Sequence, residues 1–509
     1  MTARDPAALL RQAQVLHAQG RRAEAIAVFR QVLALVPHAA EGWYELGYLL
    51  KAEGRFQEAL DAYGQALARG IRRPEEVHLN RGVIFADHLR RDADAEAELR
   101  AALAIAPRYV PALLNMGNLH EERGQREEAL AWYERLRAVG AGDDPRYARL
   151  QYEGLARTAH MRPPASLDDP LLAALRTAAA DPAVRADTVV AANVQFGLAR
   201  ALDRLGATDE AFAAFADANR GLQAQAPPYS PTQTERMVDA MIAAFPAPAP
   251  APKAAGTVPA GPEPLFICGM FRSGSTLVEQ VLAGHPRMVP GGEIDWLLRL
   301  VAGPLAPFPA SFARLDEAAI ARLAAEYRAH VARLFPQAGP GDFVTDKRPD
   351  NFRLIGLVKR LFPDAKVVHS VRDPLDTGLS VYMQHLHLRG VPYASDLAAI
   401  GHYYAQYRRL MAHWKALYPA DIHDFDYDAF VREPRPALAA LFAFLGLEFD
   451  ERVLDFHTRS NTVKTASYWQ VRKPLYGDAS GRWRRYAHHL APLRAALRAG
   501  GVGLPDDAG

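Results

Sequence analysis

Residues 264–282, PLFICGMFRSGSTLVEQVL, decide the fold of the C-terminal half of this chain. The apolar run LFIC predicts a buried strand, and the pattern from Ser275 or Thr276 onward predicts a helix. The loop between them carries Gly269 and Gly274, spaced as in a phosphate-binding loop. In such a loop, backbone N–H groups and a helix N-terminus converge on an anion, which the helix dipole favours. The stretch therefore predicts a strand, an anion-binding loop and a helix.

The residue that supplies the positive charge of this loop, and its position, differ from those in a nucleotide triphosphatase. The pattern G-x-x-x-x-G-K-[ST] needs a lysine that reaches the β- and γ-phosphates, and Ser275 stands in its place. Arg272 supplies a cation inside the loop instead, and its planar guanidinium can bind two oxygens of one anion. The alternative interpretation is a tight strand–helix turn with an arginine on the surface.

The alternation of strand and helix recurs downstream. The segment AKVVHSVRDP predicts a strand over residues 366–371, followed by Arg372, by Pro374 in a first helical turn and by Ser380 on the helix. Short apolar runs that are each followed by a polar turn and a helix indicate an α/β domain around a mostly parallel sheet. We therefore predict a P-loop-like α/β domain over residues 264–500.

The N-terminal half shows internal repeats instead. Residues 41–67 read EGWYELGYLLKAEGRFQEALDAYGQAL, and small and aromatic residues mark the repeat positions at Trp43, Leu46, Gly47, Ala59, Tyr63 and Ala66. Other copies, spaced by about 34 residues, carry Ala25, Phe29 and Pro37, then Ala95, Leu99, Ala102 and Pro107, then Gly117, Ala129 and Tyr133. A degenerate copy follows around residues 196–218, with Ala211 and Phe215 in repeat positions.

This pattern resembles the tetratricopeptide-repeat family, which implies an all-α solenoid of antiparallel helix pairs. In each pair, small residues such as Gly47 permit close approach of the helices, and Tyr63 fills the gap beside them. The degenerate copy is expected to be a terminal, capping unit. The array is expected to dock a partner or a protein substrate. The alternatives are a structural spacer and a self-association module, because the repeat pattern encodes stacking and no ligand.

Composition separates the two halves. Residues 246–264, PAPAPAPKAAGTVPAGPEP, are rich in proline and alanine and have no hydrophobic period, which is typical of an extended linker. The predicted organisation is a multidomain chain, with repeats over residues 1–143, a helical region with the degenerate repeat over 144–224, a linker region over 225–263 and the α/β domain over 264–500.

Charge and cysteine content restrict the function classes. Sixty basic and 58 acidic residues leave a formal net charge of +2, so no global field favours binding to nucleic acid or to an acidic membrane. The single cysteine, Cys268, excludes an internal disulfide framework and favours a reducing compartment. The first twenty residues lack a continuous apolar run, and no window approaches the roughly 20 apolar residues of a membrane span. We expect a cytoplasmic protein.

The C-terminal half resembles the sulfotransferase superfamily, and specifically bacterial proteins in which tetratricopeptide repeats precede a domain similar to tyrosylprotein sulfotransferases. The family motif RSGTTL, which holds the 5′-phosphosulfate of the donor, is matched with one change by Arg272, Ser273, Gly274, Ser275, Thr276 and Leu277. The resemblance covers residues 264 to about 486. It implies that 3′-phosphoadenosine 5′-phosphosulfate is the donor substrate and that no metal is required.

The resemblance also implies how the rest of the donor is held. Arg372 and Ser380 match residues that clasp the 3′-phosphate, although Arg372 could merely pair with Asp373 or Asp376. Tyr427, expected at a strand end, matches a tyrosine beside the adenine, although a core aromatic residue would need no ligand.

The matching positions for the chemistry are Glu293 and Lys347. Glu293 follows the same His-Pro as the family's catalytic glutamate and is the candidate base, with Asp295 as the competitor. The family usually has two glutamates here, and Gly292 replaces the first. Lys347 matches a lysine that neutralises charge on the bridging oxygen, and the alternative is a surface lysine in a charged loop.

A last match lies near the C-terminus. Ser467 and Lys473 match the family's S-x-x-Q-V-x-K-P, in which the serine and the lysine approach the phosphosulfate, so Ser467 joins Arg272, Lys347 and Glu293 as a catalytic candidate. The following GRWRRY adds three arginines at 482, 484 and 485, which predict a basic, lid-like segment or a solvated run of charge.

The resulting hypothesis is a sulfotransferase that acts on a hydroxyl of an acceptor, with protein tyrosine and carbohydrate among the candidates. One alternative is a P-loop kinase or hydrolase, which Ser275 disfavours. The other is an inactive nucleotide-binding scaffold in which only the repeats matter. The acceptor cannot be identified from the residues, since the contacting loops carry no readable code.

Overall fold

A computed structural model of the chain describes residues 5–139, 149–249, 261–386, 388, 390–458 and 480–504. The chain forms two compact units, Met1–Met161 and Arg162–Gly509. This division differs from the expected boundary at residues 246–264, which falls inside the second unit. The helices that precede the proline-rich segment therefore belong with the sheet domain, and each unit is described by itself.

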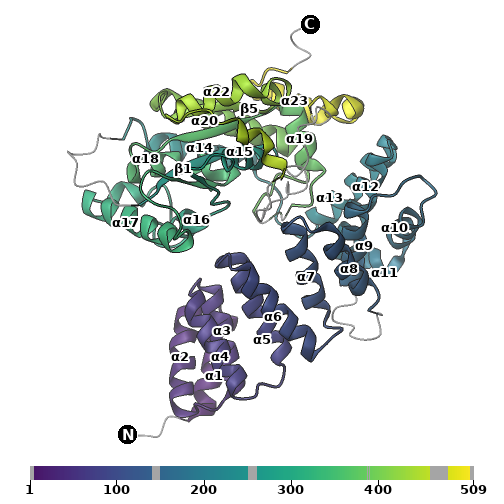
Figure 1. Ribbon diagram of the computed structural model, residues 1–509, viewed down its shortest axis with the longest axis vertical. Coiled ribbons are helices and arrows are strands. Elements are labelled where there is room, and N and C mark those ends of the chain that lie inside the picture. Colours follow the sequence, from purple (N-terminus) through teal and green to yellow (C-terminus); the bar gives the residue numbers. More distant parts are fainter. Residues whose placement is uncertain are drawn as a thin grey trace. The chain divides into compact units, whose positions relative to one another are not determined.

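The first unit is an array of antiparallel helix pairs, which Figure 1 shows from α1 to α9. Its elements are α1 Pro6–Ala18, α2 Arg22–Leu35, α3 Ala40–Ala52, α4 Phe56–Ala68, α5 Pro74–Val83, η1 Ile84–His88, α6 Asp92–Ile105, α7 Val110–Glu122, α8 Arg126–Arg137 and α9 Leu150–Met161. Consecutive helices form the contacts within each pair, α3 with α4 and α7 with α8 among them. The predicted all-α solenoid is confirmed.

The repeat residues occupy the positions at which the helices approach most closely. A Cβ added to Gly47 would lie 2.8 Å from the ring of Tyr63, and one added to Gly117 would lie 2.3 Å from the ring of Tyr133. Both tyrosines are completely buried. Glycine is therefore needed in α3 and α7 because an aromatic ring of the following helix fills the space where a side chain would stand.

The second unit begins with a helical extension, α10 Pro170–Ala180, α11 Pro182–Ala186, α12 Thr188–Arg204, α13 Thr208–Gln223 and α14 Pro231–Ala244. Helices α12 and α13 form the hairpin that the degenerate repeat predicted, and its marker residues Ala211 and Phe215 are buried. Helix α14 lies within the region expected to be a linker. It forms because Val238 and Met241 bury an apolar face on the domain that follows.

The domain that follows is built on a five-stranded sheet of order β2-β3-β1-β4-β5, in which every pairing is parallel. The strands are β1 Glu263–Gly269, β2 Met288–Val289, β3 Phe343–Lys347, β4 Val367–Val371 and β5 Ile422–Asp426. Central β1 pairs with β3 on one side, with Ile267 opposite Lys347, and with β4 on the other, with Gly269 opposite Ser370. The predicted mostly parallel α/β domain is confirmed.

Helices cover both faces of this sheet (Figure 1). The helical elements are α15 Ser275–Leu282, α16 Trp296–Ala302, η3 Phe312–Arg314, α17 Glu317–Leu334, η4 Pro349–Leu354, α18 Ile355–Leu361, α19 Pro374–Tyr382, α20 Leu397–Leu417, α21 Tyr427–Arg432, α22 Pro434–Phe444, η5 Glu451–Thr458, η8 Arg482–His489 and α23 Ala491–Ala499. Side chains alternate between the two faces of the sheet along each strand. On one face, Phe266 of β1 contacts Phe362, which follows α18, and His369 of β4 contacts Tyr407 of α20.

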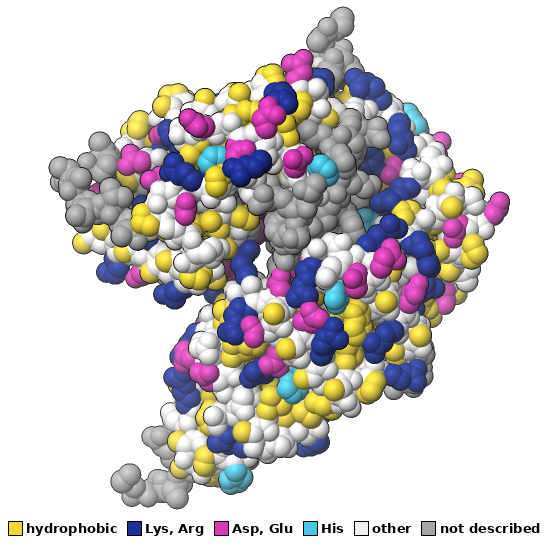
Figure 2. Space-filling model, viewed as in Figure 1, with side chains coloured by type: hydrophobic (Ala, Val, Ile, Leu, Met, Phe, Trp, Pro, Cys, Tyr) yellow, Lys and Arg dark blue, Asp and Glu magenta, His cyan; other side chains and the backbone are white. Residues whose placement is uncertain are grey.

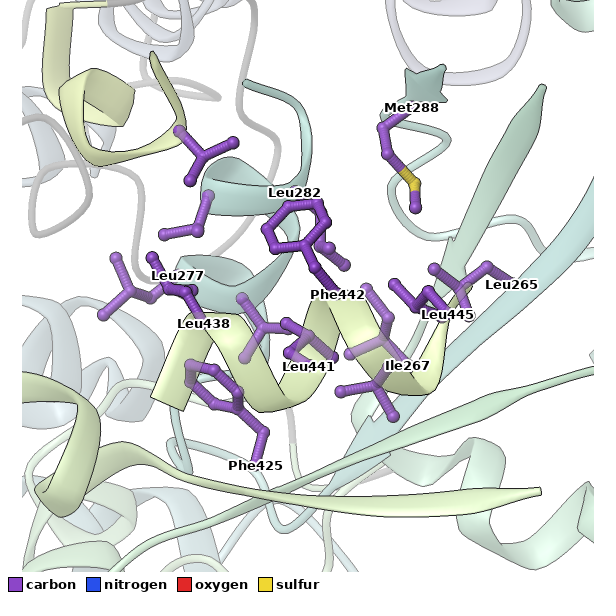
Figure 3. Close-up of a cluster of buried hydrophobic side chains, with 14 of the residues drawn as sticks. Leu265, Ile267, Leu277, Leu282, Met288, Phe425, Leu438, Leu441, Phe442 and Leu445 are labelled. Carbon is purple, nitrogen blue, oxygen red and sulfur yellow. The ribbon is translucent and has the colours of Figure 1, made fainter. Parts of the chain in front are cut away.

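The opposite side of the same strands packs against α15 and α22. Figure 3 shows Leu265 and Ile267 of β1 and Phe425 of β5 facing Leu277 of α15 and Leu441 of α22. Nearly all of these side chains are buried. Burial of apolar surface stabilises the fold by about 25 cal/mol per Å². This core fixes α15, and therefore the loop that precedes α15, against the carboxyl ends of the strands.

The helical extension is fastened to the sheet domain by polar contacts. Asn219 of α13 donates to the carbonyl oxygen of Tyr382 at 2.9 Å. Asp239 of α14 accepts from Arg409 of α20 at 2.6 Å. Phe245, which follows α14, fills the space beside Gly356, where an added Cβ would lie 2.6 Å from its ring. These contacts explain why the helices before the proline-rich segment belong to the same unit as the sheet.

The surface carries both signs of charge. On the face that Figure 2 shows, Lys and Arg side chains are interspersed with Asp and Glu, as the small net charge predicts. Among the described residues, no helix has the length and apolar character that crossing a membrane requires.

Candidate active site

The predicted site residues follow the carboxyl ends of adjacent parallel strands. Glu293 comes after β2, Lys347 is the last residue of β3, and the anion-binding loop leaves β1. Arg372 comes directly after β4, and Tyr427 directly after β5. Parallel strands place their carboxyl ends at one edge of the sheet, where open α/β domains bind ligands. Residues that are far apart in the sequence thus gather at one edge.

The loop between β1 and α15 has the backbone of an anion cradle. Arg272 and Gly274 have φ angles of 71° and 105°, in the left-handed region. Glycine is required at 274 because an added Cβ would lie 2.6 Å from the ring of Tyr427. Helix α15 begins at Ser275, as predicted, so its first N–H groups follow the loop directly. Ser275, Thr276 and Leu277 in this first turn are buried.

One hydroxyl of the loop is buried and has no partner in the described part of the chain. Ser273 is 1% exposed, and its Oγ makes no hydrogen bond. Its backbone carbonyl accepts from Ser370 Oγ at 2.9 Å, which holds the loop on the end of β4. A buried polar atom without a partner costs about 1–3 kcal/mol, so an acceptor oxygen at this place would stabilise the loop. The loop therefore fits a bound oxyanion.

Two arginines meet beside this loop. Arg272 Nε donates to Ser380 Oγ of α19 at 3.1 Å, and Arg372 Nη1 donates to the carbonyl oxygen of Arg272 at 3.2 Å. The guanidinium of Arg372 lies 4.9 Å from the centre of the Tyr427 ring, within cation–π range. The structure thus brings Ser380 to Arg272, and the predicted clasp of Arg372 and Ser380 on the 3′-phosphate stays a prediction. Tyr427 is the first residue of α21 and not part of a strand.

Glu293 and Lys347 form an ion pair. Lys347 Nζ lies 3.1 Å from Glu293 Oε1, and Arg348 Nη1 lies 3.8 Å from Glu293 Oε2. The Lys347 side chain is 0% exposed and that of Glu293 is 34% exposed. Lys347 is therefore not the surface residue of the alternative interpretation. A buried cation paired with a carboxylate that stays open to solvent is an arrangement suited to chemistry at the Glu293 end.

The remaining candidates divide into two groups. The competing base, Asp295, lies at the N-terminus of α16 and is bound by Arg299 at 2.6 Å, in an i,i+4 pair on the helix surface. Ser467 and Lys473 lie outside the described residues, so their predicted approach to the phosphosulfate stays a prediction.

A buried carboxylate that the sequence did not single out positions Glu293. Glu279 of α15 is 3% exposed. Its Oε1 accepts from the backbone N–H of Gly292 at 2.8 Å and from Thr345 Oγ1 at 2.6 Å. Thr345 Oγ1 in turn accepts from the backbone N–H of Gly291 at 2.8 Å. The segment that leads to Glu293 is therefore held against α15 and β3. The sequence feature that could have revealed this buried carboxylate is the charged Glu279 within the apolar run LVEQVL.

A second buried carboxylate fastens the C-terminal segment to α19. Asp376 accepts the backbone N–H of Gly481 at 2.5 Å and that of Trp483 at 2.8 Å. Burial raises the pKa of Asp376, and the charge of Arg372 opposes this rise. Because α19 begins beside Arg372, the start of η8 is held next to the arginine predicted to bind the donor.

The basic segment at residues 482–485 contacts the helical extension, and its predicted role as a lid stays a prediction. Arg482 Nη2 lies 2.5 Å from Asp203 Oδ2 of α12, and Arg485 Nη2 donates to the carbonyl oxygen of Asp203 at 3.0 Å. Trp483 is buried, and the guanidinium of Arg484 lies 5.0 Å from its ring. Two of the three arginines therefore anchor η8 to the helical extension, because Asp203 offers them an acceptor that the local sequence does not reveal.

Comparison with known proteins agrees with this geometry. Residues 264–451 match the model of the sulfotransferase family, and residues 10–70, 44–110 and 93–152 match models of the tetratricopeptide repeat. The chain carries a sulfotransferase-family domain behind a tetratricopeptide-repeat array. The family match begins at Pro264 and covers the strands, the anion-binding loop and α19 of the sulfotransferase domain.

The chain is also similar to individual proteins of known sequence. The chain is 29% identical to an uncharacterized protein of Aquifex aeolicus (strain VF5) over 439 residues, which cover 84% of this chain and 54% of that protein. It therefore spans about half the length of this relative. It is 25% identical to protein-tyrosine sulfotransferase 2 of Gallus gallus over 264 residues, or 46% of this chain and 68% of that one.

A solved structure also resembles the chain. The sulfotransferase domain from the Synechococcus PCC 7002 olefin synthase matches with 21% identity and a TM-score of 0.35, over 50% of this chain and 100% of that domain.

Proposed function

We propose that the second unit transfers the sulfuryl group of 3′-phosphoadenosine 5′-phosphosulfate to a hydroxyl group of an acceptor. The observation that carries this proposal is the position of two charged clusters at one edge of the sheet. One cluster, Arg272 with Ser380 and Arg372, follows β1 and β4. The other, Glu293 with Lys347, follows β2 and ends β3.

The first cluster is proposed to hold the donor. The residues of the loop and the first turn of α15, Arg272, Ser273, Gly274, Ser275, Thr276 and Leu277, would surround the 5′-phosphosulfate. The orphaned Ser273 hydroxyl and the α15 N-terminus support this role. Arg372 and Ser380 would bind the 3′-phosphate, and Tyr427 would lie beside the adenine. In this interpretation the hydrogen bond from Arg272 to Ser380 is replaced by bonds to the two phosphate groups.

The second cluster is proposed to carry the chemistry. Glu293 accepts the proton of the acceptor hydroxyl while that oxygen forms a bond to sulfur. The bond from sulfur to the bridging oxygen breaks, and 3′-phosphoadenosine 5′-phosphate leaves with the electron pair. Lys347 neutralises the charge that develops on the leaving oxygen, and Arg272 is proposed to contribute positive charge from the loop. Ser467 and Lys473 are proposed to approach the same group from the C-terminal segment.

The two alternatives make different demands on these residues. A kinase or hydrolase of the P-loop type needs a lysine at Ser275 and carboxylates for a metal around the γ-phosphate. An inactive nucleotide-binding scaffold needs no ion pair at Glu293 and Lys347. The repeats are proposed to dock the acceptor or a protein partner. Peptide tyrosine and carbohydrate are both candidates for the acceptor.

Calorimetry on the Arg372→Ala variant tests the donor assignment. The variant should bind 3′-phosphoadenosine 5′-phosphate much more weakly than the unchanged chain does, because a charge-assisted contact to the 3′-phosphate is lost. Its affinity for AMP, which lacks that phosphate, should change far less. Equal losses for both ligands would show that Arg372 only supports the loop and Tyr427.

Sulfur-labelled donor tests the activity itself. The full chain, incubated with a lysate and the labelled donor, should transfer label to acceptors that mass spectrometry identifies, and Glu293→Gln should abolish most of that transfer. Donor binding without transfer to any acceptor would favour the scaffold interpretation.

A further inference from the structure

Two histidines and an aspartate converge at the contact between the helical extension and η8. His488 Nε2 lies 2.8 Å and His489 Nε2 lies 2.9 Å from the same oxygen, Oδ1 of Asp209 in the first turn of α13. The three potential ligand atoms all lie within 4.8 Å of one another. The side chains of Asp209 and His488 are 75% and 62% exposed, and that of His489 is 24% exposed.

The least exposed of these ligands is already oriented. The ring of His489 stacks on Phe212 of α13, with 4.0 Å between ring centres and an angle of 3° between the planes. Phe212 also contacts the rings of Tyr382 and Tyr486, so it is held from several sides. A supported ring that aims its Nε2 at a carboxylate lowers the cost of ordering a site.

The chemistry of this ligand set selects a class of ion. Imidazole nitrogen with carboxylate oxygen suits Zn²⁺ and its neighbours in the first transition row, whereas Mg²⁺ and Ca²⁺ prefer oxygen alone. Zn²⁺ bonds of about 2.0–2.2 Å place tetrahedral ligand atoms about 3.4 Å apart. The two Nε2–Oδ1 separations of 2.8 and 2.9 Å need only a small outward shift to reach that spacing. Water would complete the coordination.

We propose that Asp209, His488 and His489 form a binding site for a first-row transition-metal ion of the Zn²⁺ class. The ion is structural, because the site belongs to the far end of η8 and includes no residue of the two charged clusters at the sheet edge. It fastens α13 to the end of η8.

The position of η8 gives this site a role. At its start, η8 is held by Asp376 of α19 through the N–H of Trp483. In its middle, Tyr486 donates to Asp203 of α12 at 2.7 Å. An ion at the end of η8 adds a third attachment, made by covalent coordination in place of two exposed hydrogen bonds. The metal therefore stabilises the C-terminal segment that borders the donor-binding arginine.

The experiment measures metal binding and stability on the full chain, after treatment with a chelator. Isothermal titration with ZnCl₂ should show one site per chain in the unchanged protein. Asp209→Asn, His488→Ala and His489→Ala should each lower the affinity by about tenfold or more, at least the loss caused by removing an outer-shell partner. Co²⁺ should give visible absorption of a tetrahedral site, and MgCl₂ should give no binding.

Two matched variants serve as controls. Glu210→Gln changes the neighbouring carboxylate, which pairs with Arg176 at 3.0 Å, and His38→Ala removes an exposed histidine of the first unit. Both should bind Zn²⁺ as the unchanged chain does. Circular dichroism establishes that every variant folds, which is expected because the changed side chains lie on the surface.

Stability provides the second readout. Zn²⁺ should raise the melting temperature of the unchanged chain and of both controls, and at the same concentration should raise that of the three ligand variants clearly less. The proposal is overturned if the unchanged chain binds no Zn²⁺, or if the ligand variants bind it as tightly as the controls do. Binding without any rise in melting temperature would overturn the structural role of the ion.

Discussion

Oε1 of Glu279 accepts the hydroxyl of Thr345 at 2.6 Å, and this contact joins the helix behind the anion-binding loop to the strand that ends in Lys347. The same oxygen accepts the backbone N–H of Gly292, the residue before Glu293. One buried carboxylate thus links the segment carrying the proposed base to the strand carrying the proposed lysine. Glu279 therefore connects the helix that follows the anion-binding loop with the residues proposed to act as base and as lysine.

Removing this support should misplace Glu293 without touching the donor. Glu279→Ala leaves the N–H of Gly292 and the hydroxyl of Thr345 without their acceptor, at a cost of about 1–3 kcal/mol of unfolding free energy. Its kcat should fall while its affinity for 3′-phosphoadenosine 5′-phosphate is kept. Glu279→Gln retains the Oε1 acceptor, so it should restore most of both the stability and kcat.

Kinetics with calorimetry and denaturant unfolding separate these outcomes. A residue that only fills the core would lower stability in Glu279→Ala without lowering kcat of the folded fraction. Failure of Glu279→Gln to restore kcat would show that the negative charge, and not the hydrogen bonds, is what Glu279 supplies.

The base itself is tested by Glu293→Gln. The amide cannot accept the proton of an acceptor hydroxyl, so kcat should fall by roughly 10²–10⁴, the range that general-base catalysis contributes. Donor affinity should change little, because Glu293 is proposed to act on the acceptor hydroxyl, and it pairs with Lys347 and Arg348. Steady-state transfer of sulfur label and calorimetric donor binding give the two quantities.

Asp295→Asn is the matched control for this variant. Asp295 lies two residues away, and its carboxylate is already bound by Arg299. Native turnover in Asp295→Asn with a strong loss in Glu293→Gln supports the assignment, and the reverse pattern would transfer the role to Asp295.

Asp346, the residue before Lys347, makes the stability of the second unit depend on pH. Burial raises its pKa to about 7, although Asn351 and Tyr327 donate hydrogen bonds that favour the charged form. A raised pKa means that the folded state holds a proton which the unfolded chain releases. Between roughly pH 4 and pH 7 the folded state binds more protons at this site, so its stability falls as the pH rises through that window.

The contribution of Asp346 is measured by comparing how the unfolding free energy changes with pH in the unchanged chain and in Asp346→Asn. Asp346→Asn cannot titrate, so its unfolding free energy should fall less steeply with pH than that of the unchanged chain, by about 1.4 kcal/mol per pH unit within the window. Exposed Asp364→Asn should keep the original slope. Denaturant unfolding at a series of pH values gives these slopes, and parallel curves for Asp346→Asn and the unchanged chain would contradict the assignment.

The sequence predicted what local patterns determine. The start of α15 at Ser275 and of α19 at Pro374 follows from glycine, proline and apolar spacing within a few residues. The pairing of Glu293 with Lys347 needed the order of the strands, which no local pattern contains. The contact of Arg272 with Ser380 could not be predicted for the same reason, since 108 positions of the sequence separate the two residues.

The division into two compact units could not be predicted from composition, because composition describes a segment and not its neighbours. Residues 246–264 have the proline and alanine content of a linker, yet this does not tell whether the helices before them pack on the domain after them. The contacts that attach them, such as the polar pair of Asp203 with Arg482 and the packing of Phe245 on Trp414, join residues that lie far apart in the sequence.

Truncation tests where the sulfotransferase domain can be cut. A chain that starts at Arg162 keeps the contacts of Asn219, Asp203 and Asp239 with the domain, so it should unfold cooperatively and bind 3′-phosphoadenosine 5′-phosphate as the full chain does. A chain that starts at Pro246 lacks all three, and it also lacks Phe245, which packs beside Gly356 and Trp414.

The shorter chain should therefore melt several degrees lower or fail to fold, because loss of a buried phenylalanine alone costs about 3–5 kcal/mol. Phe245→Ala in the full chain isolates that part of the loss, and the exposed Leu167→Ala serves as its control. Calorimetric melting and ligand binding on the four proteins decide the matter. If the chain from Pro246 is as stable as the chain from Arg162, the helical extension is a separate module, and the proline-rich segment is the linker that its composition suggests.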